Sequence, residues 1–243
     1  MSVAVKGGHN DENHNHNDVG TFLVASDGVP VIVDAGRPSY DARTFSERRY
    51  ELWPMRSEWH NVPLVAGRGQ PTGREYAADV VGVQTGNAPS LELELAGAYD
   101  VAGLESWRRE VLLDRERAEV RVHDAWRWAS ADAAGAPAPA PAPTQLRMLL
   151  AGDVAITPDS QGDDSAAITP LGGAPRVHVT WTGTATATLT PIEPDDPMLT
   201  DVWGPRLVRL DLDVADRSTM TVTVRQEHST PPFGDTNAVG DAE

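Results

Sequence analysis

The chain has 243 residues and a formal net charge of −16, with 36 acidic against 20 basic side chains. It contains no cysteine, which excludes disulfides, thiolate metal sites and thiol catalysis. The acidic balance makes nucleic acid and anionic membranes poor partners, and no apolar run approaches the roughly 20 residues of a membrane-spanning helix. No signal-peptide pattern opens the sequence, and the localisation is left open between cytoplasm and export.

Short apolar segments that alternate with a period of two recur between closely spaced glycines and prolines, as in Leu91-Glu-Leu-Glu-Leu95. This pattern predicts strands with one solvated face. The predicted strands are 19–26, 29–33, 77–85, 90–95, 107–113, 117–128, 145–152, 176–181, 206–214 and 219–224. No segment carries a helical period for more than about two turns. We therefore expect an all-β protein, an antiparallel β-sandwich, with one domain over residues 1–228.

Three segments depart from this pattern. Residues 38–63 form a long connection rich in Arg, Glu and Trp, and loops of that length in a compact domain are often functional. Residues 133–143 are an Ala-Pro tract, which predicts an extended, solvated spacer between two strands. Residues 229–243 carry several acids and no base, and we expect a flexible acidic tail.

The residues that suggest chemistry are histidines and one aspartate within residues 6–70. In an extended chain, His14 and His16 would point to the same side. Asp34 ends an apolar strand, and His60 follows the long loop. Two or three imidazoles with one carboxylate suit a divalent ion, with zinc favoured. The alternative for the His-x-His pair alone is a disordered metal-affinity tract or a solvated turn.

A cupin-like metal site is an alternative interpretation of the same residues. Gly8, followed after five residues by His14 and His16, fits the start of the cupin metal motif. That motif continues with a glutamate four or five residues later, where this chain has Gly20 and Thr21. The missing ligand weakens this interpretation.

A closer resemblance is to heparinase II/III-like polysaccharide lyases. The run Lys6-Gly-Gly-His-Asn-Asp-Glu-Asn-His-Asn-His-Asn-Asp-Val-Gly-Thr-Phe22 resembles a characteristic block of that family. The similarity continues in order through Asp27-Gly28, Asp34-Ala-Gly36, Tyr40, Arg49-Tyr50, Arg56-Ser57, His60-Asn61 and Gln70. The similarity covers roughly residues 5 to 75. The later predicted strands are compatible with the family's supersandwich-like C-terminal domain but carry no diagnostic motif.

The resemblance implies roles for particular residues. His16, Asp34 and His60 correspond to the ligands of one divalent metal, usually zinc, and His14 to a catalytic histidine facing the substrate cleft. Other family members also carry a helical toroid before the sandwich, which supplies the tyrosine that acts as acid and base. That toroid is expected as the missing partner here, so we expect the isolated chain to be inactive.

The implied reaction is β-elimination on an acidic, uronate-containing polysaccharide. Removing the C5 proton requires neutralisation of the adjacent carboxylate, a base at C5 and an acid at the C4 oxygen. A neutral imidazole such as His14 can relay a proton or offset charge. The metal is expected to order the loop before His60 rather than to act as a Lewis acid.

Substrate contacts are predicted in the same loop. The segment from Arg43 to Glu75 contains six arginines and four glutamates, which gives it a net charge of +2 in an otherwise acidic chain. Arg49 and Arg56 could bind a uronate carboxylate through a bidentate fork, although Arg–Glu pairs within the loop explain them equally well. Trp59 could stack on a sugar ring or anchor the loop to the sandwich. The overall acidity favours a lightly sulfated or unsulfated glycan.

Three functions remain open from the sequence. The first is the C-terminal metal-binding domain of such a lyase. The second is a non-catalytic carbohydrate-binding or scaffold module that keeps only the metal, and the third is a cupin-like metalloenzyme active by itself.

Overall fold

The computed structural model describes residues 1–129, 143–158, 164–183 and 185–227. Its strands in chain order are β1 (Ser2–Val5), β2 (His9–Asn10), β3 (Phe22–Ser26), β4 (Val29–Ile32), β5 (Gly73–Ala77), β6 (Asp79–Gln84), β7 (Ser90–Glu94), β8 (Leu104–Asp114), β9 (Glu119–Trp128), β10 (Gln145–Ala151), β11 (Asp153–Pro158), β12 (Asp164–Thr169), β13 (Val177–Trp181), β14 (Ala187–Ile192), β15 (Leu207–Asp213) and β16 (Thr219–Gln226). One α-helix, α1 (Pro197–Trp203), and five 3-10 turns complete the described part. The Ala-Pro tract, apart from Pro143, and the tail 229–243 lie outside it.

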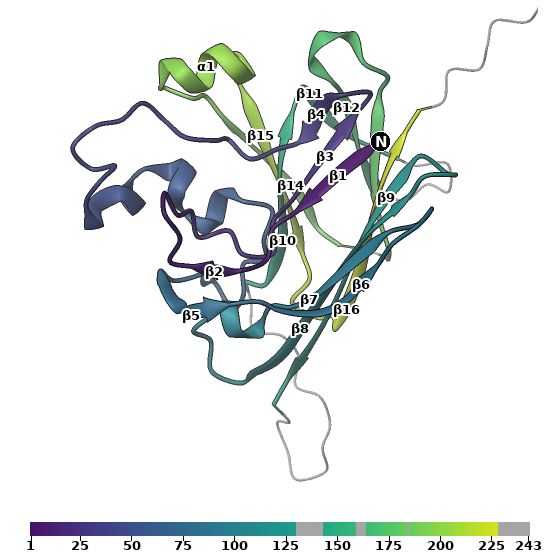
Figure 1. Ribbon diagram of the computed structural model, residues 1–243. Coiled ribbons are helices and arrows are strands. Elements are labelled where there is room, and N and C mark those ends of the chain that lie inside the picture. Colours follow the sequence, from purple (N-terminus) through teal and green to yellow (C-terminus); the bar gives the residue numbers. More distant parts are fainter. Residues whose placement is uncertain (130–142, 159–163, 184, 228–243) are drawn as a thin grey trace, which may run out of the picture.

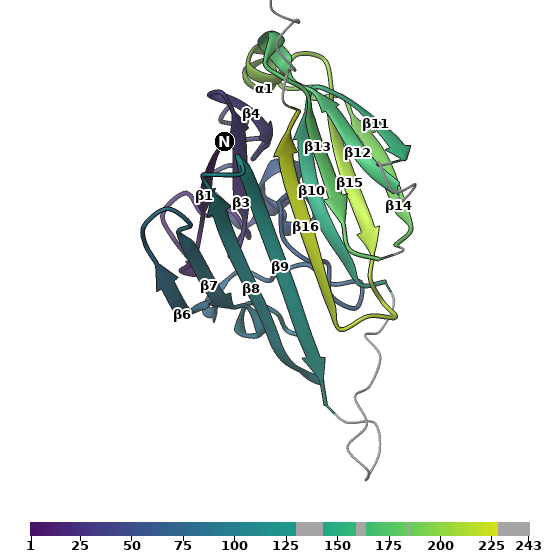
Figure 2. The same cartoon turned by 90° about the vertical axis from the view of Figure 1, so that its right-hand side faces the viewer.

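Two antiparallel sheets face each other and confirm the predicted all-β sandwich (Figures 1 and 2). The six-stranded sheet has the order β1-β3-β4-β10-β15-β14. The eight-stranded sheet has the order β11-β12-β13-β16-β9-β8-β7-β6, and β2 pairs with β5 in a small third sheet. No helix in the described ranges has the length and apolar character needed to cross a membrane.

The main core lies between the two large sheets, and period-two alternation decides which side chains enter it. Along β10, Leu146, Met148 and Leu150 belong to this core. Leu149 and Ala151 point to the other face of the six-stranded sheet and pack in a second apolar cluster. The central strand β10 is therefore apolar on both faces, as expected for a strand that is covered twice.

The cover on that second face comes from the long loop and from α1. Residues 38–63 contain no strand, as predicted, but form three 3-10 turns, η1 (Glu47–Glu51), η2 (Trp53–Met55) and η3 (Ser57–Trp59). Trp53 and Trp59 from the loop and Trp203 from α1 pack against the second cluster. Their rings fix the loop on the sheet and so place its last residues beside β4 and β10.

All ten predicted strands are present, with ends that differ by a few residues. Strands β1, β2, β5, β11, β12 and β14 and the helix α1 were not predicted. β12 is rich in alanine and serine, which have weak strand preference. β14 contains Pro191, which is tolerated because β14 lies at the edge of its sheet.

Candidate metal centre

Three residues from separate segments converge beside the long loop. His16 follows the turn at residues 12–14, Asp34 comes two residues after β4, and His60 directly follows η3. One ligand atom from each lies within 4.8 Å of the others, and no other group of at least three such residues is found in the described part of the chain. The structure thus brings together the three residues predicted as metal ligands.

Asp34 lies between the two imidazoles. Its Oδ2 is 2.9 Å from His60 Nδ1, and its Oδ1 is 4.0 Å from His16 Nδ1. The two imidazole rings are 5.2 Å apart and tilted by 46°. The backbone N–H of Gly36 donates to Asp34 Oδ1 over 2.7 Å, and Gly36 has a φ of 81°, which glycine adopts without strain. This turn fixes the direction of the carboxylate.

The surroundings of His60 fit a metal ligand. Its side chain is 1% exposed, and within the described residues neither ring nitrogen has a partner in hydrogen-bonding geometry. Leaving a buried polar atom unpaired costs free energy of about 1–3 kcal/mol. A zinc ion would satisfy one nitrogen of each histidine and one carboxylate oxygen, and two imidazoles with a carboxylate are a common zinc donor set. The residues present therefore fit a divalent ion.

The three groups shift one another's protonation. Burial and the neighbouring His60 lower the pKa of His16. For Asp34, burial acts to raise the pKa, but the charge of His60 and its contact outweigh burial and leave that pKa well below its usual range. Burial acts to lower the pKa of His60, but the Asp34 carboxylate outweighs this effect and raises it. The net result is an ionised Asp34 with His16 favoured in its neutral form, which is the form that binds metals.

Two asparagines that the sequence analysis did not single out hold the segment of His16 against the long loop. Asn15 Nδ2 donates to the Tyr50 hydroxyl over 3.2 Å and to Asn17 Oδ1 over 3.0 Å. The Asn17 backbone N–H donates to the Met55 carbonyl over 3.3 Å. Both asparagine side chains are buried. The contacts with Tyr50 and Met55 could not be found from the sequence, because they join residues at least 35 positions apart.

Lys6 and Asp18 form a second contact that was not predicted. Lys6 Nζ makes an ion pair with Asp18, whose side chain is buried. The negative charge of Asp18 acts to raise the pKa of both His16 and His60, and Lys6 opposes it. The pair therefore belongs to the electrostatic surroundings of the candidate metal centre.

His14 lies differently from what its spacing suggested. It is exposed in a turn and has a φ of 60°, so the chain is not extended at this point. The expectation that His14 and His16 share one side of an extended segment is therefore wrong, because the turn redirects the backbone. His14 is not part of the metal-ligand group. Its role at the substrate cleft stays a prediction.

The three residues predicted to bind substrate lie in or beside the turns of the long loop. The guanidinium of Arg49 lies 5.7 Å from the ring centre of Tyr50, and Arg49 Nη2 is 3.8 Å from Met55 Sδ. Arg56 is exposed just before η3. The ring of Trp59 is half-buried, with Trp53 at 5.3 Å edge-on and the Arg209 guanidinium at 4.5 Å. Trp59 anchors the loop, which was one of its two predicted roles.

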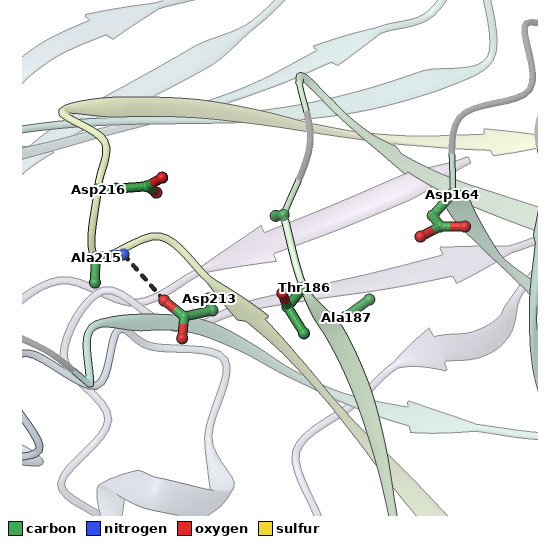
Figure 3. A pocket seen from close by; sticks show the side chains of 7 residues that line it. Asp164, Thr186, Ala187, Asp213, Ala215 and Asp216 are labelled. Carbon is green, nitrogen blue, oxygen red and sulfur yellow. Dashed lines mark hydrogen bonds between the residues drawn. The ribbon is translucent and has the colours of Figure 1, made fainter.

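A separate pocket of about 560 Å³ lies away from these residues. Three aspartates line it, Asp164 at the start of β12, Asp213 at the end of β15, and Asp216 (Figure 3). Asp213 Oδ1 accepts a hydrogen bond from the Ala215 N–H. Its aspartates do not qualify as a shared metal site, since His16, Asp34 and His60 form the one group found in the described residues.

Comparisons with known proteins agree with the architecture. The family model described as "Heparinase II/III-like, C-terminal" matches residues 1–196. A search of curated proteins gave no match. Among solved structures, heparan sulfate lyase HepC from Pedobacter heparinus is similar with a TM-score of 0.66 and 16% identity, over 95% of this chain and 34% of that one.

Two other structures give the same picture. The heparinase III that is the BT4657 gene product has a TM-score of 0.66 and 17% identity, over 92% of this chain and 32% of its own. A further heparinase III has a TM-score of 0.61 and 17% identity, over 89% and 31%. The chain spans about a third of the length of these proteins. At such identities the structures show the fold, and the family model shows the membership: the chain belongs to the heparinase II/III-like family and matches its C-terminal domain.

Proposed function

We propose that this chain is the metal-binding C-terminal β-sandwich of a polysaccharide lyase that acts by β-elimination on uronate-containing glycans. One divalent ion, with zinc favoured, is held by His16, Asp34 and His60. The observation that carries this proposal is the convergence of the three ligand atoms, together with the buried imidazole of His60, whose Nδ1 lies 2.9 Å from Asp34 Oδ2 and whose Nε2 has no partner within the described part of the chain. The match to the heparinase II/III-like C-terminal model supports the lyase class.

The bound ion would contribute positive charge and fixed geometry at the end of the long loop. Proton transfer and neutralisation of the substrate carboxylate would be carried out by side chains. His14 is exposed close in sequence to His16, and a solvent-accessible imidazole can relay a proton at neutral pH. In the proposed reaction His14 neutralises the uronate carboxylate or moves a proton, so that the C5–H becomes acidic enough to be removed. The acid and base that complete the reaction would come from a helical domain that accompanies this sandwich.

The charges of the long loop and of the whole chain favour one class of glycan substrate over another. Two arginines of the loop are engaged internally, Arg48 with Glu51 and Arg43 with Asp41. Arg49 and Arg56 are not in such pairs within the described structure, and they are the candidates to bind a uronate carboxylate. With a chain charge of −16, a lightly sulfated or unsulfated polymer is a better substrate than a highly sulfated one.

The experiment is elemental analysis of the chain purified after expression with added zinc. We expect about one equivalent of metal, lost in His60→Ala and retained in His123→Ala, which removes an exposed histidine on β9. Chelation should loosen residues 38–63 in limited proteolysis while the sandwich persists, since its core does not include the metal centre. A metal-free wild-type chain would exclude the proposed site.

A further inference from the structure

Arg109 is a charged residue inside the sandwich. It lies on β8 with its side chain 2% exposed, next to Asp124 on β9, which is fully buried. Arg109 Nε donates to Asp124 Oδ1 over 2.9 Å and Nη2 donates to Asp124 Oδ2 over 3.0 Å. Trp107 Nε1 donates to the same carboxylate over 2.7 Å. This bidentate pair fixes the plane and direction of the guanidinium.

The third nitrogen of the guanidinium, Nη1, binds the segments that carry the proposed metal ligands. This nitrogen donates to the carbonyl of Gly20 over 3.0 Å and to the carbonyl of Asn61 over 2.7 Å. Gly20 comes four residues after His16, and Asn61 directly follows His60. One guanidinium on the eight-stranded sheet therefore links the backbone directly after His60 to the segment that carries His16.

Asn61 extends the link to the third ligand. Its Nδ2 donates to the carbonyls of Phe22 over 2.7 Å and Val33 over 3.0 Å, and Val33 directly precedes Asp34. Its Oδ1 accepts the Leu149 N–H over 2.7 Å, which connects the same amide to β10. The path Asp124–Arg109–Asn61 thus reaches the backbone beside His60 and Asp34 and the segment of His16.

Stability alone does not account for such a pair. Burying two charges has a large desolvation cost, and apolar residues of similar volume are often at least as stabilising in the same place. Residues behind a metal site, in contrast, commonly set the orientation of the ligands and affect metal affinity by about 10–100-fold. The contacts of Arg109 are those expected of a residue that orients ligand-bearing backbone.

We propose that Arg109, oriented by Asp124, is a positioning residue of the metal centre that holds the segments of His16, Asp34 and His60 at binding distance from one another. This inference rests on the proposed metal site. It also assigns a role to the eight-stranded sheet, which contributes no ligand but fixes the geometry of the ligands through one side chain.

The test compares three variants of the full chain. Arg109→Met combined with Asp124→Asn removes both charges and leaves an acceptor for Trp107. Arg109→Lys keeps the charge beside Asp124, but its single nitrogen cannot bind both Asp124 oxygens and also reach the two carbonyls. Ile168→Ala, in β12 of the same sheet, is the control, because Ile168 is fully buried and has no contact with this network among the hydrogen bonds described.

Zinc titration and amide hydrogen exchange of the metal-free chain are the two readouts. We expect at least about tenfold weaker zinc binding and faster exchange at Asn61 and Leu149 in the double variant, with a smaller loss in Arg109→Lys. Ile168→Ala should lower the melting temperature and leave both readouts unchanged. If the double variant does not fold, Arg109→Lys decides.

Unchanged affinity and exchange in a folded Arg109 variant would overturn the inference. A wild-type chain that binds no zinc would instead refute the proposed metal site. In that case, exchange in the metal-free chain still decides whether Arg109 holds these segments, so the two failures are distinguishable.

Discussion

Asp34 connects the two histidines of the candidate metal centre, because each of its carboxylate oxygens faces one imidazole. Its direction is fixed by the Gly36 N–H, and its negative charge favours a cation between the rings. His60 is buried behind it, whereas His16 is partly accessible. A metal would therefore enter from the side of His16 and be held most firmly by Asp34 and His60.

His14 and His16 are two residues apart but are predicted to differ in function. His14→Ala should leave zinc content and melting temperature nearly unchanged, because His14 lies in an exposed turn outside the ligand group. His16→Ala should lose most of the metal. Elemental analysis and thermal unfolding of both variants in parallel check this prediction. Equal metal loss in both would make His14 a ligand and remove it from the substrate cleft.

Metal affinity should depend on pH in a way that reflects the different protonation of the two histidines. Because Asp34 raises the pKa of His60 above the usual 6.5, protons compete with zinc for His60 already above that pH. His16, whose pKa is lowered, adds a second competing proton only below it. As the pH decreases, zinc affinity should thus begin to fall above pH 6.5, and the fall should approach about tenfold per pH unit once His60 is mostly protonated. Titrations from pH 8 to 6 that give one constant affinity would contradict this assignment.

At the scale of elements, the long loop is held by aromatic packing and not by regular secondary structure. The rings of Trp53 and Trp59 pack on the outer apolar cluster of the six-stranded sheet, and the Arg209 guanidinium lies against Trp59. Since η3 leads directly into His60, this packing also sets the position of one predicted metal ligand.

Trp59 and Arg56 are both predicted to bind substrate, but their different packing predicts different effects of substitution. Trp59→Ala should lower the free energy of unfolding by about 2 kcal/mol, because a half-buried ring leaves the apolar cluster. Arg56→Ala should leave thermal stability unchanged, since Arg56 is exposed, and should weaken binding of a uronate oligosaccharide. Thermal unfolding and oligosaccharide titration of both variants are the measurements. A destabilised Arg56→Ala would indicate a structural role for this arginine.

The sequence indicated strands well where alternation was strict, as in β7, β13 and β16, and poorly where alanine, serine or proline weakened it, as in β12 and β14. The family resemblance pointed to His16, Asp34 and His60 as one group, and the structure places these three side chains together. The turn at His14 could not be predicted, because an extended chain was the simplest assumption for a His-x-His pair. The alternation of β8 places Arg109 on the same face as Trp107, but the partner Asp124 and the two carbonyls depend on the tertiary fold.

As a whole molecule, the chain has two sheets with a continuous apolar core between them, while the candidate metal centre lies beside that core. The solved relatives are about three times as long as the part that this chain matches. In the proposed function, the acid and base come from a helical domain beyond the matched region, and the sandwich would supply the metal centre and His14.

The isolated chain should show no measurable elimination on uronate polymers, because the proposed acid and base belong to a helical partner domain. Absorbance of the unsaturated uronate product is the readout. In a protein that contains both domains, His14→Ala should lower turnover by about 10²–10⁴-fold. A non-catalytic carbohydrate-binding module would bind glycan without turnover in either form. Robust activity of the isolated chain, lost in His14→Ala, would show that the sandwich contains a complete active site.

The most direct test of the metal centre is a crystal structure of the zinc-loaded chain with anomalous data collected at the zinc absorption edge. The account predicts one strong peak at about 2.0–2.2 Å from one nitrogen of His16, one nitrogen of His60 and a carboxylate oxygen of Asp34. No peak at this position, or a peak only in the pocket lined by Asp164, Asp213 and Asp216, would contradict it.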